Sequence, residues 1–212
     1  MKKALVLAAL LLAGSTLQSK AQYISIGPVG GFGHSWVSNM TGTAQFKASP
    51  TLGLGLVYSK DNHWGWGAEL DVSHEGYRMD NGLNTMAVNP VYLRLPLRAY
   101  YFFGKYGSNV RPKIYLGPTF GFKVDEVAYM NGSRMSNTDV MTVYSMNNDM
   151  FNSFDVGLNT GAGVNVRLMK ATWLNMDLGY NLGFLDAVDD AAGNYNMNQN
   201  LRVNVGLLFG LK

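Results

Sequence analysis

The feature that most constrains this chain is a strict alternation of apolar and polar residues, which recurs along most of its length. In the clearest run, residues 64–73, the even positions carry Trp, Ala, Leu and Val, whereas the odd positions carry Gly, Glu, Asp and Ser. Successive side chains of a β-strand point to opposite faces, so the pattern predicts strands with one apolar and one polar face. Eight such runs follow one another: residues 22–34, 52–58, 64–74, 91–103, 113–123, 154–167, 174–184 and 201–211.

Alternation alone leaves two kinds of barrel open, because a soluble barrel with its apolar face inside has the same period. The polar face here is rich in Gly and Asn, which suits a narrow lumen better than a solvated exterior. Short connectors (60–62, 104–110, 169–171) also alternate with long ones (37–50, 78–88, 125–152, 186–198). Short periplasmic turns and long external loops are typical of outer-membrane barrels. The sequence therefore predicts an all-β fold, an eight-stranded antiparallel transmembrane β-barrel in the outer membrane.

The N-terminus predicts export. Lys2 and Lys3 precede an apolar run from Ala4 to Ala13, and a small-x-small site ends at Ala21. This run is shorter than the roughly 20 residues that a membrane-spanning helix needs, so we expect a signal peptide at 1–21 and the barrel domain at 22–212. Cleavage would remove three of the 17 Lys and Arg residues, leaving 14 against 14 Asp and Glu. A neutral mature chain does not indicate a nucleic-acid partner.

The predicted register directs charged side chains into the lumen. A lumen this narrow is filled by side chains, and charges in it are expected to pair because an unpaired buried charge is costly. We expect Glu69 or Asp71 to pair across strands with Arg94 or Arg98. The whole predicted set is Glu69, Asp71, Glu75, Arg94, Arg98, Lys113, Lys123, Asp155, Arg167, Asp177 and Arg202. These residues form either a structural network or the lining of a narrow pore.

Aromatic residues are expected in two girdles, at the two membrane interfaces. The periplasmic girdle is predicted at Tyr58, Trp64, Trp66, Tyr101, Phe103, Trp173 and Phe209. The outer girdle is predicted at Tyr77, Phe120, Phe122, Phe154 and Phe184. Pro96 and Pro118 fall within strands, where each removes a hydrogen-bond donor, so bulges or rim positions are expected there.

Several segments resemble the PorT-like, porin-type β-barrel family of Bacteroidetes outer membranes. They are Tyr92-Leu93-Arg94-Leu95-Pro96-Leu97, Tyr100-Tyr101-Phe102, Tyr115-Leu116-Gly117-Pro118, Phe154-Asp155-Val156-Gly157 with Gly161 and Gly163, and Leu178-Gly179-Tyr180 with Gly183. The resemblance covers nearly the whole mature chain and implies an outer-membrane barrel that accommodates both prolines. It implies no particular activity.

Few residues suggest catalysis or metal binding, and the chain has no cysteine. His74 lies between Ser73 and Glu75, but in a strand these two neighbours point away from it, so no catalytic set is expected. Soft-metal binding could come from five methionines, Met130, Met135, Met141, Met146 and Met150, and Ca²⁺ binding from the loop with Asp186, Asp189, Asp190 and Asn194. Solvated loops are the preferred interpretation of both, and we expect no cofactor.

The sequence thus favours a non-enzymatic barrel with a largely filled lumen, which acts through its long external loops. Its expected partners are outer-membrane lipid and lipopolysaccharide, with other envelope proteins as further candidates for the loops. The alternative from a different class is a small porin-like channel for ions or small solutes. A lipid-modifying enzyme is a more remote third.

Overall fold

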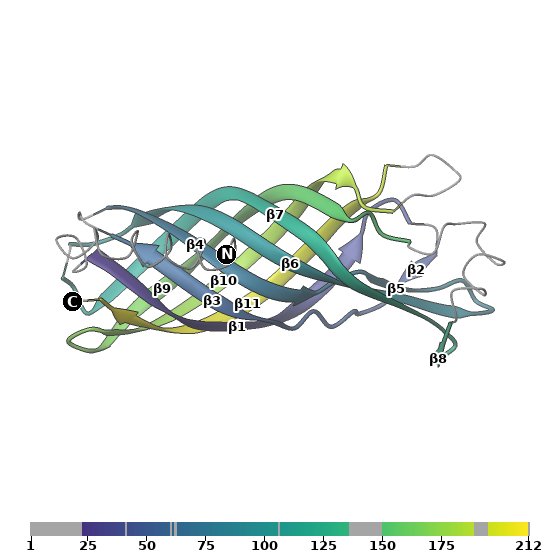
Figure 1. Ribbon diagram of the computed structural model, residues 1–212, viewed down its shortest axis with the longest axis horizontal. Coiled ribbons are helices and arrows are strands. Elements are labelled where there is room, and N and C mark those ends of the chain that lie inside the picture. The colour runs from purple at the N-terminus through teal and green to yellow at the C-terminus, as the bar shows by residue number, and fades with distance from the viewer. Residues whose placement is uncertain are drawn as a thin grey trace, which may run out of the picture.

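The computed structural model describes residues 23–40, 42–59, 61, 63–105, 107–135, 150–188 and 195–211 (Figure 1). Eight long strands form the barrel wall. They are β1 (Ile24–Val37), β3 (Thr51–Tyr58), β4 (Trp64–His74), β6 (Thr85–Phe102), β7 (Val110–Met130), β9 (Phe154–Met169), β10 (Thr172–Asp186) and β11 (Met197–Gly210). The predicted signal peptide lies outside the described residues. Among the described residues, no helix is long and apolar enough to cross a membrane.

The eight strands close into a ring in which each strand pairs antiparallel with its neighbours in sequence, and β1 closes on β11. This closing ladder runs from Ser25 opposite Gly210 to Val37 opposite Asn198. Closure leaves the ring without an unpaired edge, which a sheet in lipid requires. The predicted eight-stranded antiparallel barrel is therefore confirmed.

The wall of the barrel projects further at one end than at the other. The short turns and the C-terminal end of β11 lie together at the left of Figure 1. At the right, three short strands extend the wall: β2 (Thr43–Ala44), β5 (Tyr77–Asp80) and β8 (Ser133–Arg134). Short turns are typical of the periplasmic side, so we call the left end periplasmic and the right end outer.

The outer end contains more sheet than the sequence predicted. Residues 78–88 and the start of 125–152 were expected to be loops, yet β6 begins at Thr85 and β7 continues to Met130. These ends pair with each other, from Met86 opposite Met130 to Val91 opposite Asp125. Short strands β5 and β8 pair on either side of them, and β2 pairs with β5. We call this projecting sheet of β2, β5, the start of β6, the end of β7 and β8 the outer extension.

The prolines lie neither at rims nor in bulges, which corrects the expectation from the sequence. Pro96 lies in the middle of β6, and the β4–β6 ladder resumes beyond it with unchanged register, from Ala68–Leu97 to Asp71–Arg94. Pro118 similarly interrupts only the β6–β7 ladder, while it remains paired with Leu158 of β9. A strand residue directs its N–H to one neighbour, so each proline costs pairing on one side only. The register shift of β6 and β7 lies instead at Val91 and Tyr92.

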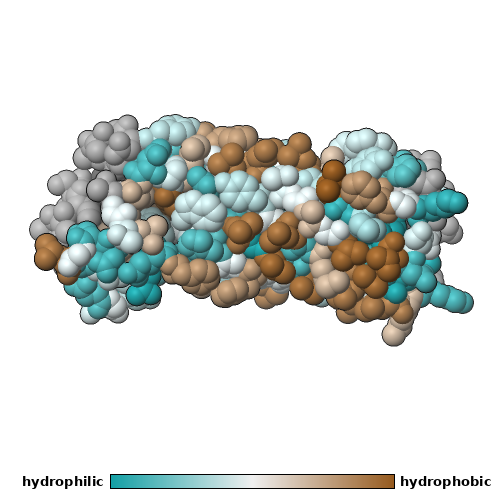
Figure 2. Space-filling model, turned by 180° about the vertical axis from the view of Figure 1, so that it is seen from behind, coloured by the Kyte–Doolittle hydropathy of each residue, from teal (hydrophilic) through white to brown (hydrophobic). Residues whose placement is uncertain are grey.

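The outward face of the wall is apolar. Leu52, Trp66 and Leu178 are more than half exposed, as expected of side chains that contact lipid. Figure 2 shows apolar residues over the middle of the wall and toward the periplasmic end, whereas hydrophilic residues predominate at the outer end, on the left of that view.

Six of the seven residues predicted for the periplasmic girdle face outward or lie near the rim. Trp64, Trp66, Phe103 and Phe209 are exposed, and Tyr101 packs edge-on against Trp64 with ring centroids 5.3 Å apart. Tyr58, also partly exposed, lies opposite Trp66.

Two aromatic placements predicted from the sequence are wrong. Trp173 lies on the same face of β10 as Asn175, next to a register shift at Thr172, and packs against apolar residues inside the barrel. Tyr77, expected in the outer girdle, is 5% exposed and also lies in a buried cluster. Of the other outer-girdle residues, Phe120 is partly buried, and Phe122, Phe154 and Phe184 are exposed.

Candidate functional site

The outermost polar layer of the lumen is centred on Arg94. Its guanidinium donates to Glu75 Oε2 at 2.5 Å and to Asp155 Oδ2 at 2.6 Å, so one cation from β6 joins two acids. Asn198 of β11 also donates to Glu75 Oε2, at 2.5 Å. All four side chains are almost fully buried. This layer therefore connects opposite walls of the ring through charge-assisted hydrogen bonds.

The next layers toward the periplasm repeat the arrangement. Arg98 pairs with Glu69, one of the pairings expected from the sequence, and donates from Nε to Asn159 Oδ1 at 2.5 Å. Lys113 pairs with Asp177 at 3.0 Å and lies 4.8 Å from the centre of the Tyr100 ring. We call the buried ion pairs of these three layers the lumen charge network: Glu69, Glu75, Arg94, Arg98, Lys113, Asp155 and Asp177.

The remaining predicted lumen residues also face inward but lie outside this network. Asp71 is 3% exposed, yet the described side chains give it no ion pair. Arg202 is buried, with Nη1 3.5 Å from Ser73 Oγ. Lys123 pairs with Glu126 near the outer end, and Arg167 lies at the periplasmic end over the Trp173 ring.

Buried apolar side chains cluster inside the barrel on both sides of the charge network. The outer apolar cluster consists of Val37, Tyr77, Met86, Val88, Tyr92, Ala128, Met150, Phe151, Ala187 and Val188. The periplasmic apolar cluster consists of Val29, Val57, Tyr100, Phe102, Tyr115 and Leu208, with Trp173 packed against it.

Sequence analysis missed Glu126, which fixes part of the outer apolar cluster. Its Oε1 accepts the backbone N–H of Met150 at 2.8 Å, and its Oε2 accepts that of Phe151 at 3.0 Å. Lys123 donates to the same carboxylate at 2.9 Å and also to the Phe151 carbonyl. Glu126 was expected in a loop, and its polar character gave no sign of these backbone contacts. Residues 150 and 151 are thereby held over the outer end of the lumen.

Sequence analysis also missed Arg111, which lies two residues before the predicted run that begins at Lys113 and has the same parity as Lys113. Arg111 is 4% exposed and lies with its guanidinium 4.1 Å from the centre of the Phe102 ring. It donates to Ser59 Oγ at 2.9 Å and to the Asp61 carbonyl at 3.2 Å. Backbone N–H groups of Trp64 and His63 donate to the Asp61 carboxylate, and these bonds hold its pKa below the usual value.

The residues considered for catalysis or metal binding do not come together in one site among the described residues. Ser73 donates to Glu75 Oε1 at 2.8 Å inside the lumen, whereas His74 is exposed on the opposite face of β4. Met150 lies in the outer apolar cluster and Met135 packs against it, so two of the five methionines serve as apolar contacts. Asp186 accepts the Asn196 backbone N–H at 2.9 Å. Met141, Met146, Asp189, Asp190 and Asn194 lie outside the described residues.

A closed eight-stranded ring with an apolar exterior and a polar, charged interior defines a small transmembrane barrel of the outer membrane. The chain belongs to the family described as "Outer membrane protein beta-barrel domain", whose profile matches residues 17–189. This membership places the protein in the cell outer membrane.

One solved structure agrees with this fold, and two others show a weaker likeness. The outer membrane protein OprG of Pseudomonas aeruginosa is similar with a TM-score of 0.52 and 18% identity, over 88% of this chain and 93% of its own. Ail, the attachment invasion locus protein of Yersinia pestis, has a TM-score of 0.45 and 14% identity, over 88% of this chain and 97% of its own. Outer Membrane Protein W of E. coli has a TM-score of 0.48 and 13% identity, over 87% of this chain and 98% of its own. No curated protein matches the chain.

Proposed function

We propose that this protein is a non-enzymatic outer-membrane barrel with a closed lumen, which acts through the surface that it presents outside the cell. The observation that carries the proposal is a succession of three buried layers inside the barrel, and ions cross apolar constrictions poorly. An apolar cluster lies at each end, and the charge network lies between them. Buried ion pairs with several hydrogen bonds each are suited to a fixed structural role rather than to passing ions.

The outer extension is the natural candidate for contacts with partners. Leu83, between β5 and β6, is 89% exposed, and Arg78 and Arg134 are exposed on the neighbouring strands. Exposed cations and an exposed apolar side chain on the same extension suit an anionic amphiphilic partner, and lipopolysaccharide has this chemistry. Other envelope proteins remain the second class of partner. The PorT-like relationship is likewise part of this proposal, supported by the motifs around Pro96 and Pro118.

The test is complementation of a strain that lacks the protein, with survival in detergent as the readout of envelope integrity. We expect the wild-type chain to restore survival and a triple variant, Arg78→Ser, Leu83→Ser and Arg134→Ser, to restore it poorly. These side chains are exposed, so the variant should fold normally. The control is Lys105→Ser, a variant of an exposed residue at the periplasmic end, and it should complement fully. Full complementation by the triple variant would contradict a role for the outer extension.

A further inference from the structure

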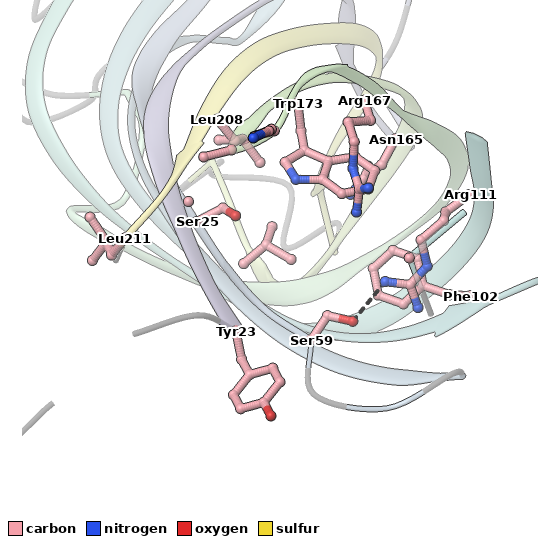
Figure 3. Close-up of a pocket in the computed structure, with 15 residues that line it drawn as sticks. Tyr23, Ser25, Ser59, Phe102, Arg111, Asn165, Arg167, Trp173, Leu208 and Leu211 are labelled. Carbon is pink, nitrogen blue, oxygen red and sulfur yellow. Dashed lines mark hydrogen bonds between the residues drawn. The ribbon is translucent and has the colours of Figure 1, made fainter. Parts of the chain in front are cut away.

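The periplasmic end of the barrel contains a cavity of about 520 Å³, at the opposite end from the outer extension (Figure 3). Its volume is within the range of small-molecule sites, roughly 300–1,000 Å³. Its floor is apolar, because Val57, Phe102 and Leu208 of the periplasmic apolar cluster line it. The charge network lies beyond that floor, so the cavity is a separate compartment.

The cavity wall is cationic. Arg111, Arg167 and Lys170 line it, and its described lining includes no Asp or Glu. The nearby carboxylate of Asp61 is not part of the lining, and it already accepts two backbone N–H groups. Three cations without a lining acid produce a positive potential that favours an anion.

Two of these cations are held against aromatic rings. The Arg111 guanidinium lies 4.1 Å from the centre of the Phe102 ring, and that of Arg167 lies 4.6 Å from the Trp173 ring. Figure 3 shows Arg167 and Trp173 side by side within the cavity, with Arg111 beside Phe102. Arg111 lies on β7, the strand that pairs with the β9 segment of Arg167. A cation–π contact fixes a guanidinium without using all of its N–H donors. Arg111 already donates to Ser59 and to the Asp61 carbonyl, so it contributes mainly its positive charge to the cavity.

Arg167 has such a donor. Its Nε is buried, and no described atom accepts a hydrogen bond from it. A buried polar group without a partner costs free energy, and a shift of the side chain that brought this N–H to an anion in the cavity would relieve the cost. The aromatic ring and the guanidinium together offer an apolar surface beside a charged donor.

We propose that this cavity binds a small amphiphilic anion, with its carboxylate or phosphate group at Arg167, Lys170 and Arg111 and its apolar body against Trp173, Phe102 and Leu208. The ligand enters from the periplasmic side. The ligand is either a lipid from the periplasmic leaflet of the outer membrane or a free periplasmic molecule, since both can combine an anionic group with an apolar body. The proposal does not depend on the role of the outer extension.

The test is calorimetric titration of the folded protein in phosphatidylcholine nanodiscs, which leave both ends accessible. The probe is 2-naphthoate, the matched neutral control is 2-naphthalenemethanol, and inorganic phosphate represents the head group alone. We expect saturable binding of 2-naphthoate, weaker binding of phosphate, and no saturable binding of the neutral control. Arg167→Gln should weaken naphthoate binding about tenfold, the effect of losing a charge-assisted hydrogen bond.

Two further variants keep the result interpretable. Lys170 is exposed in a turn, so Lys170→Gln should fold normally and still weaken binding, whereas Arg78→Gln at the outer end should leave binding unchanged. Equal binding of the neutral probe, or unchanged naphthoate binding in both cavity variants, would overturn the proposal. Repeating the titration with phosphatidylglycerol in the nanodisc identifies the source. A lower apparent naphthoate affinity indicates a competing lipid, and an unchanged affinity indicates a free ligand.

Discussion

Replacement of Arg94 by Met is expected to lower the free energy of unfolding by about 3–5 kcal/mol, the usual cost of removing one partner of a buried ion pair. The effect should be near the upper end of that range, because Arg94 neutralises both Glu75 and Asp155. The variant would leave these two buried acids facing each other without a cation. Urea unfolding of the barrel refolded into phosphatidylcholine vesicles measures the change.

A rescue variant shows whether the lost stability comes from the unpaired acids or from the lost packing of the Arg94 side chain. Adding Glu75→Gln and Asp155→Asn to Arg94→Met removes the uncompensated charges, so most of the lost stability should return. The matched control is Arg78→Met on the exposed face of β5, which should change stability by less than about 0.5 kcal/mol. Unchanged stability in Arg94→Met would contradict the charge network as a structural element.

Replacement of Gly117 by Ala is expected to destabilise the barrel by about 1–3 kcal/mol, the usual cost of overpacking. A Cβ atom at this position would lie 1.9 Å from the Leu97 carbonyl oxygen of β6. Strand β7 cannot move away from β6 without disturbing its hydrogen bonds to β9 on the other side. Gly27 has the same environment, with the Leu207 oxygen at 1.9 Å, and both glycines directly precede a proline at which one ladder is interrupted.

Gly30 provides the matched control for Gly117. A Cβ atom there would approach no atom closer than the Thr51 oxygen at 3.8 Å, an ordinary contact distance. Gly30→Ala should therefore leave urea unfolding within about 0.5 kcal/mol of the wild type. Equal effects of the two substitutions would mean that the close approach of β6 and β7 does not constrain the fold.

The alternation of side chains was enough to predict the barrel and the inward direction of its charges, since both depend only on the two-residue period. The alternation predicted a pairing of Glu69 or Asp71 with Arg94 or Arg98, because the two strands are neighbours in sequence, and Glu69–Arg98 is one of these pairings. It could not predict that Arg94 joins Asp155, since β6 and β9 do not pair and their contact crosses the lumen.

The errors have local physical causes. Trp173 was assigned to the lipid interface by its residue type, although its position in β10 places it with Asn175 inside the barrel. Glu126 was missed because its contacts are with the backbone of Met150 and Phe151, which carries no signal in the sequence. The outer extension was missed because its strands, such as β5, are short.

The filling of the lumen is the central claim, and conductance across planar lipid bilayers tests it most directly. The purified protein should first be shown to be folded by its gel mobility without boiling. We predict that the folded protein inserts but gives no steady conductance steps, as expected if the two apolar clusters and the charge network close the lumen. Steady channels whose conductance changes in Arg98→Lys would contradict this account and would identify the protein as a small porin-like channel.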